Sequence, residues 1–202
     1  MIENPGERLR SLALRMERQL ETPLAEQRRQ NEKHLVFGAG DPAAEVVFVG
    51  EAPGRREAES GEPFVGAAGK LLEALLSEIG LERGAVYITN VVKDRPPGNR
   101  RPRVGEIESY KPYLIRQLDI IQPEIIVPLG LVASKVVLEM FAAGPGSHTM
   151  GALHGHIFEC DAAWGEIRIL PMYHPAASFY GSLSKADLQE DFKVLQDILG
   201  GV

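Results

Sequence analysis

Cysteine is almost absent from this sequence, because Cys160 is the single one in 202 residues. One thiol cannot form a disulfide within the chain, a structural zinc site or an iron–sulfur cluster. Long apolar runs are also lacking, since none approaches the roughly 20 residues that a membrane-spanning helix needs. The N-terminal segment is charged throughout and lacks the apolar run of a signal peptide. We therefore expect a cytoplasmic protein without membrane contact.

The chain also lacks an excess of positive charge, with 22 Lys and Arg against 28 Asp and Glu and a net charge of −6. This balance alone disfavours a nucleic-acid partner. The basic residues are unevenly distributed, however, because Lys93–Arg103 holds five of them and one acid. A local cationic loop can bind phosphates on an acidic protein, since charges further away than about 8–10 Å are screened.

Short apolar runs that alternate with helical periodicities indicate an α/β fold. EVVFVG (45–50), AVYITNVV (85–92) and EIIVPLG (124–130) are typical of strands buried on both faces. Apolar residues at helical spacing predict helices near 5–20, 71–79, 107–121, 131–141 and 188–199. Such alternation predicts a three-layer α/β/α sandwich with a central, mainly parallel four-stranded sheet.

The length suits one domain, which we predict to span residues 1–202. Residues 1–34 are expected to form an N-terminal helical extension packed on the body, with 21–34 as an exposed polar connection. We place Pro112 in or near the first turn of the helix at 107–121. Ligands of parallel sheets bind at the carboxyl ends of strands, so the segments after each strand are candidates for a site.

Three of these segments carry residues that can take part in binding or catalysis. GEAPG (50–54) offers a tight glycine turn and Glu51, whose simpler interpretation is a solvated loop acid. Asn90 ends a strand and can read a pyrimidine edge, because a carboxamide both donates and accepts, or it merely caps the strand. His174 follows a strand and can donate to a developing anion, or it is ordinary polar surface.

Taken together, the segments are similar to one enzyme family. GEAPG…GEPFVG, YITNVVK-x-RPP-x-NR-x-P, IIVPLG and P-x-x-HP occur in the order found in family-4 uracil-DNA glycosylases, and the upstream HLVFGAGDP resembles that family's VVFGEG-x-P. The resemblance covers roughly residues 35–180. It implies an enzyme that flips uracil out of DNA, hydrolyses the N-glycosidic bond and leaves an abasic site.

The resemblance also implies roles for individual residues. Phe64 would stack on the flipped uracil, Asn90 would hydrogen-bond its O4/N3 edge, and His174 would donate to O2 as charge builds. Glu51 would orient or activate the water, assisted by the backbone of Gly50, Glu51 and Ala52. Glu57 would help to exclude the 5-methyl group of thymine.

The expected DNA contacts lie on the cationic loop and after the histidine. The loop residues are Lys93, Arg95, Arg100, Arg101 and Arg103, and the wedge that fills the vacated stack is Phe179 or Tyr180. The predicted partner is uracil-containing DNA, single- or double-stranded, bound by a monomer.

The chain departs from this family at the iron–sulfur cluster, which its members hold with four cysteines. Those positions fall here on Pro23 and Glu26, on Asp94, and on Ser109 or Tyr110. We therefore expect no metal cluster and no other cofactor. Asp94 could form a salt bridge with Arg95 or Arg101 in its place, and we interpret Cys160 as a small buried hydrophobe.

Two other functions remain open at this point. The chain has HPAASFYGS where the family commonly has HPSYLLR, which allows a glycosylase for another deaminated base, such as hypoxanthine or xanthine. The missing cluster and the acidic composition allow a non-catalytic module that binds uracil or abasic sites in DNA.

Overall fold

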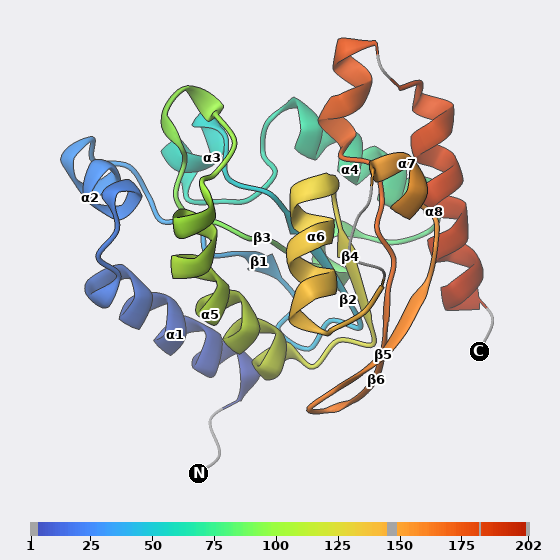
Figure 1. The fold of residues 1–202 in the computed structure, drawn as a ribbon, viewed down its shortest axis with the longest axis horizontal. Coiled ribbons are helices and arrows are strands. Elements are labelled where there is room, and N and C mark those ends of the chain that lie inside the picture. The colour runs from blue at the N-terminus through green and yellow to red at the C-terminus, as the bar shows by residue number, and fades with distance from the viewer. Residues whose placement is uncertain (1–3, 145–148, 182, 201–202) are drawn as a thin grey trace.

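The computed structural model describes residues 4–144, 149–181 and 183–200. A six-stranded sheet of order β1-β3-β2-β4-β6-β5 lies at its centre (Figure 1). The strands are β1 (Ala39–Gly40), β2 (Val46–Gly50), β3 (Tyr87–Asn90), β4 (Ile125–Pro128), β5 (Phe158–Ala162) and β6 (Gly165–Ile169).

The four inner strands β3, β2, β4 and β6 are parallel, and the two edge strands β1 and β5 pair antiparallel. The expected mainly parallel centre is confirmed, but the expected number of four strands in the sheet is wrong. β1 has only two residues, too few for any periodic pattern. β5 adds an antiparallel hairpin partner for β6 at the other edge.

Helices cover both faces of the sheet. They are α1 (Pro5–Gln19), α2 (Pro23–Gln30), α3 (Arg55–Ser60), α4 (Ala67–Glu78), α5 (Val104–Ile121), α6 (Leu131–Met140), α7 (Met150–Leu153) and α8 (Lys185–Gly200). Short 3₁₀ helices occur at Arg83–Ala85, Pro97–Asn99 and Pro175–Tyr180. Within the described ranges, no helix combines the length and apolarity needed to cross a membrane.

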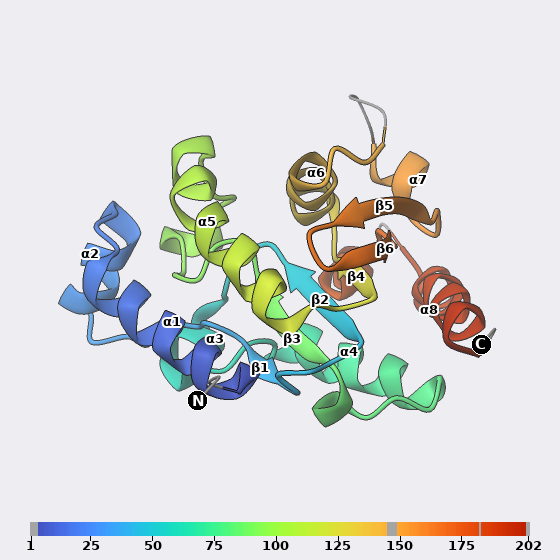
Figure 2. The ribbon, with the colours of Figure 1, turned by 90° about the horizontal axis from the view of Figure 1, so that it is seen from below.

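The alternation of side chains along β2 separates two cores. Val47 and Val49 pack in a core that includes α1, α5 and α6, whereas Val46 and Phe48 pack in one that includes α4 and α8. Figure 2 shows these two groups of helices on opposite sides of the sheet. The layered arrangement leaves the carboxyl ends of the parallel strands free to build a site.

Two local expectations are wrong. Part of the connection at 21–34 is a helix, α2, whose Leu24 and Ala25 are buried. Thr22 caps this helix, because its Oγ1 accepts from Ala25 N at 3.1 Å. Pro112 lies in the middle of α5, because that helix begins at Val104, earlier than its apolar stripe indicates.

Candidate active site

A cavity of about 660 Å³ opens where β2 and β3 end. Glu51, Phe64, Asn90 and His174 all line it, although they come from segments up to 123 positions apart. A volume of this size is typical of pockets for small ligands. Ala52 and Glu57 line the same cavity, so six of the seven predicted substrate residues share one space.

The seventh predicted residue, Gly50, lies directly behind the cavity as the last residue of β2. A Cβ at this position would lie 2.3 Å from Asn90 Oδ1 and 2.8 Å from two carbons of the Phe64 ring. The missing side chain therefore makes room for both the carboxamide and the aromatic ring.

Phe64 is buried and adopts a left-handed backbone conformation, with φ of 52°. This conformation is uncommon for a bulky residue and needs support from its surroundings. Glu57 Oε1 accepts from the backbone nitrogens of Val65 and Gly66 at 3.0 and 2.8 Å. Arg83 donates to the carbonyl oxygens of Pro63 and Phe64, the latter at 3.2 Å. Two opposite charges thus fix the backbone on both sides of the ring.

His174 lines the cavity, and its hydrogen bond defines which ring nitrogen carries the proton. Its Nδ1 accepts from Ala176 N at 3.1 Å, so the proton of the neutral ring lies on Nε2. Burial lowers the pKa of His174 to about 4, so the ring is neutral near pH 7. Asp191 of α8 supports the segment, because its Oδ2 accepts from Tyr173 N at 2.9 Å.

Glu51 and Asn90 offer polar groups that are not engaged elsewhere. Neither side chain makes a hydrogen bond to another residue within the described ranges. Burial raises the pKa of Glu51 above its usual 4.5, and the charge of Arg101 opposes this effect. Both groups are available to a ligand or a water in the cavity.

Lys93 lies behind the cavity and not on the surface. It is completely buried, and its Nζ donates to Thr89 Oγ1 and to the backbone oxygen of Asn90, each at 2.6 Å. The expectation that Lys93 contacts DNA is therefore wrong in this structure. Burial lowers the pKa of this amine well below its usual value, and its hydrogen bonds fix the strand end that carries Asn90.

The rest of the cationic loop borders the cavity. Arg100 lines it and pairs with both carboxylate oxygens of Glu106, at 2.8 and 2.6 Å. Arg95 is half-buried, whereas Arg101 and Arg103 are exposed. The DNA contacts of these four arginines stay a prediction.

The two wedge candidates lie on the 3₁₀ helix Pro175–Tyr180. Phe179 is half-exposed, with 50% of its surface accessible, which suits a side chain that enters a base stack. The side chain of Tyr180 lies outside the described part of the structure. The choice between them stays open.

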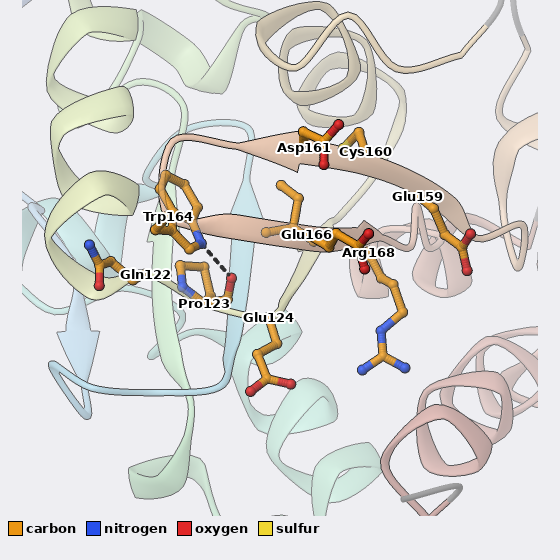
Figure 3. Close-up of a pocket in the computed structure, with 10 residues that line it drawn as sticks. Gln122, Pro123, Glu124, Glu159, Cys160, Asp161, Trp164, Glu166 and Arg168 are labelled. Atoms are coloured by element: carbon orange, nitrogen blue, oxygen red, sulfur yellow. Dashed lines mark hydrogen bonds between the residues drawn. The ribbon is translucent and has the colours of Figure 1, made fainter.

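A second hollow, of about 710 Å³, lies beside the β5–β6 hairpin (Figure 3). Trp164 forms one wall, and its Nε1 donates to Pro123 O at 3.0 Å. Four carboxylates line this hollow against one arginine: Glu124, Glu159, Asp161 and Glu166 against Arg168. This mainly negative lining repels phosphates. The cavity of about 660 Å³ at the ends of β2 and β3 is therefore the candidate site for nucleic acid.

Comparison with known proteins agrees with the geometry. The sequence profile of the Uracil DNA glycosylase superfamily matches residues 37–196. This chain belongs to that superfamily. It is 45% identical over 168 residues to the type-4 uracil-DNA glycosylase of Archaeoglobus fulgidus, covering 83% of each protein.

Two further type-4 uracil-DNA glycosylases are similarly close. The enzyme of Sulfurisphaera tokodaii is 46% identical over 82% of this chain and 74% of its own length. The enzyme of Pyrobaculum aerophilum is 42% identical over 79% of this chain and 80% of its own. The type-4 family that the motifs resemble is therefore confirmed.

The iron–sulfur cluster associated with type-4 glycosylases does not fit the residues of this one. Asp94 and Tyr110 bind one another, because the tyrosine hydroxyl donates to Asp94 Oδ2 at 2.7 Å. The charge partner of Asp94 is Arg28, whose Nε lies 2.6 Å from Asp94 Oδ1, so the expected pairing with Arg95 or Arg101 is wrong. Cys160 lies on β5 and is half-buried, less enclosed than we expected.

Several supporting residues of this glycosylase were missed at the sequence level: Arg28, Arg83 and Asp191. Asp191 left a detectable signal, because it interrupts the apolar stripe of α8 between Leu188 and Phe192. Arg28 pairs with a buried carboxylate and Arg83 with two backbone carbonyls, but the sequence around each does not distinguish it from a solvated arginine.

Proposed function

We propose that this chain is a monofunctional uracil-DNA glycosylase of DNA repair, which hydrolyses the N-glycosidic bond of deoxyuridine and leaves an abasic site. The supporting observation is the meeting of Glu51, Phe64, Asn90 and His174 around one cavity, in a chain 45% identical to a type-4 enzyme. The substrate is uracil-containing DNA, and the cavity receives the base after it leaves the stack.

Recognition of the base uses the ring and the carboxamide. Phe64 stacks on the flipped uracil and excludes water from one face. Asn90 hydrogen-bonds the O4/N3 edge, and this pairing rejects cytosine, whose amino group replaces O4. Glu57 is the predicted barrier to the 5-methyl group of thymine, in addition to the backbone contacts that it makes.

Bond cleavage uses the imidazole and the carboxylate. As the bond between C1′ and N1 breaks, its electron pair moves to uracil, and neutral His174 donates from Nε2 to the developing charge at O2. Glu51 orients a water at C1′ and accepts its proton as the oxygen bonds to the sugar. Uracil leaves as the N1 anion, which solvent then protonates.

As the pH falls, activity should be lost because Glu51 becomes protonated, at a pH where His174 is still neutral. Burial holds the pKa of Glu51 above 4.5, and only the carboxylate can accept the proton of water. His174 titrates at about 4, so it is still neutral where Glu51 becomes protonated. A profile of log kcat/KM against pH should fall on the acid side from above 4.5, and Arg101→Gln should move this limb to higher pH. If this limb does not move in Arg101→Gln, the charge of Arg101 does not lower the pKa of Glu51.

Loss of Arg83 should weaken uracil binding without loss of the fold. Arg83→Gln removes charged hydrogen bonds to the carbonyls of Pro63 and Phe64 and releases the left-handed turn. We expect kcat/KM for a uracil-containing oligonucleotide to fall about tenfold, the effect of about 1.4 kcal/mol. Arg116→Gln, at an exposed residue of α5, is the control. An equal change in both variants would argue against a role for Arg83 at the ring.

The function itself is tested by base release. The wild-type protein is incubated with oligonucleotides that carry one uracil, hypoxanthine or xanthine, and free bases are measured with strand cleavage at abasic sites. We expect release of uracil. Release of hypoxanthine or xanthine alone would favour the other-base glycosylase, and tight abasic-site binding without any release would favour the non-catalytic module.

The remaining predictions concern context. We propose a single domain over residues 1–202, acting as a cytoplasmic, nucleoid-associated monomer. Arg95, Arg100, Arg101 and Arg103 are the proposed contacts to the DNA backbone, with Phe179 or Tyr180 as the wedge. Single- and double-stranded DNA both remain candidate substrates.

A further inference from the structure

A buried polar network joins three segments that are far apart in the sequence. Thr22 precedes α2, Arg28 lies on α2, Asp94 follows β3, and Tyr110 lies on α5. Tyr110 donates to Asp94 Oδ2 at 2.7 Å and therefore accepts from Thr22 Oγ1 at 3.1 Å. Arg28 Nε lies 2.6 Å from Asp94 Oδ1, a close charge contact without the alignment of a hydrogen bond.

This network is enclosed by protein. The side chains of Arg28 and Asp94 are 5% and 1% exposed, and Arg28 Nη2 has no hydrogen-bond partner within the described ranges. Loss of Arg28 would leave the Asp94 carboxylate buried without its charge partner, and loss of Asp94 would leave Arg28 only the longer contact to the half-exposed Glu17 at 3.5 Å, so either loss is unfavourable. The pair is therefore a rigid junction between α2 and the segment after β3.

The junction stands at one end of the cationic loop. Asp94 begins the segment, and the pair of Arg100 with Glu106 holds its far end against α5. Pro96, Asn99 and Arg100 of this loop form one wall of the active-site cavity. A loop fixed at both ends keeps its arginines in one arrangement relative to the cavity.

We propose that the Thr22–Arg28–Asp94–Tyr110 network is a positioning device for DNA binding. It holds the loop from Asp94 to Arg103 in the conformation that contacts the DNA backbone, and none of its four side chains contacts DNA itself. The inference rests on the proposed function. It also gives a structural explanation for the misfit with an iron–sulfur cluster, because Asp94 stands where the resemblance places one cysteine, and Tyr110 is one of the two candidates, with Ser109, for another.

The test uses a variant whose change in net charge favours DNA binding although the proposal predicts weaker binding. Asp94→Asn removes one negative charge from the protein, which by itself favours DNA binding. We expect the opposite, a KM for a uracil-containing oligonucleotide raised about tenfold with kcat within threefold of wild type. Asp119→Asn, at a half-exposed residue of α5, makes the same charge change and should leave KM unchanged. A rise in KM that is equal in both variants overturns the proposal.

A second measurement separates positioning from loss of stability. Affinity for DNA with an abasic-site analogue is measured over a range of salt concentrations for the wild type, Asp94→Asn, Arg28→Gln and the double variant. In each single variant, the slope of log affinity against log salt concentration should decrease by about the amount of one phosphate contact. The double variant should recover part of this lost slope. Unfolding alone would reduce the active fraction without changing the slope, so an unchanged slope overturns the proposal.

Tyr110→Phe covers the case in which the charge variants do not fold. This variant removes one hydroxyl and keeps the ring. We expect its KM for a uracil-containing oligonucleotide to rise about threefold. An unchanged KM in a folded variant contradicts the network's role. Wild-type protein that releases no uracil would refute the proposed function alone, because the salt dependence of abasic-site binding still tests the network.

Discussion

Replacing His174 with alanine should lower kcat for uracil release by about 10²–10³-fold, the usual effect of losing one donor to a developing anion. The neutral ring donates from Nε2 only, because Nδ1 accepts from Ala176 N. The substitution removes this donor where charge appears on the leaving base. Single-turnover release from a uracil-containing oligonucleotide measures the effect directly.

A glutamine at the same position tests whether donation is the reason. The His174→Gln side chain keeps an N–H donor, so it should recover part of the rate that His174→Ala loses. Affinity for abasic-site DNA should stay within a few fold of wild type in both variants. Equal rates for wild type and the alanine variant would exclude His174 from the chemistry.

The second large effect is expected from a single methyl group. Gly50→Ala places a Cβ 2.3 Å from Asn90 Oδ1 and 2.8 Å from the Phe64 ring, closer than real contacts allow. The carboxamide and the ring must both move away, and a displacement of about 1 Å can cost about 10²-fold in rate. We expect kcat/KM for uracil-containing DNA to fall by at least this factor.

Gly84→Ala is the matched control, because a Cβ there meets nothing within 4 Å. Both variants should give the far-ultraviolet circular dichroism of the wild type, while only Gly50→Ala loses activity. Near-normal turnover of Gly50→Ala would show that Asn90 and Phe64 tolerate displacement, and the proposed recognition of uracil would then be wrong.

The sequence was sufficient to predict the parallel centre of the fold and a set of side chains that line one cavity, among them Glu51, Asn90 and His174. Strands such as Val46–Gly50 are continuous apolar runs, and the segments that follow them carry the motifs. Parallel strands bring their carboxyl ends to one edge, so residues such as Asn90 and His174 meet although they are distant in sequence.

The supporting contacts could not be predicted in the same way. Lys93 belongs to a basic stretch whose pattern indicates solvent, yet the turn after β3 directs it inward. Arg28 appears in a polar run that lacks an apolar stripe, and its burial depends on Asp94, which is 66 positions away. Long-range polar pairing of this kind leaves no periodic signal along the chain.

Helix α4 illustrates a constraint on engineering this protein for heat resistance. Glycine in a helix costs about 1 kcal/mol relative to alanine, so helical glycines are the usual targets for stabilising substitutions. A Cβ at Gly69 would lie 1.7 Å from the carbonyl oxygen of Phe64 and would push the stacking ring out of place. Gly105, exposed in the first turn of α5 with open space around it, offers the same gain in stability without touching the pocket.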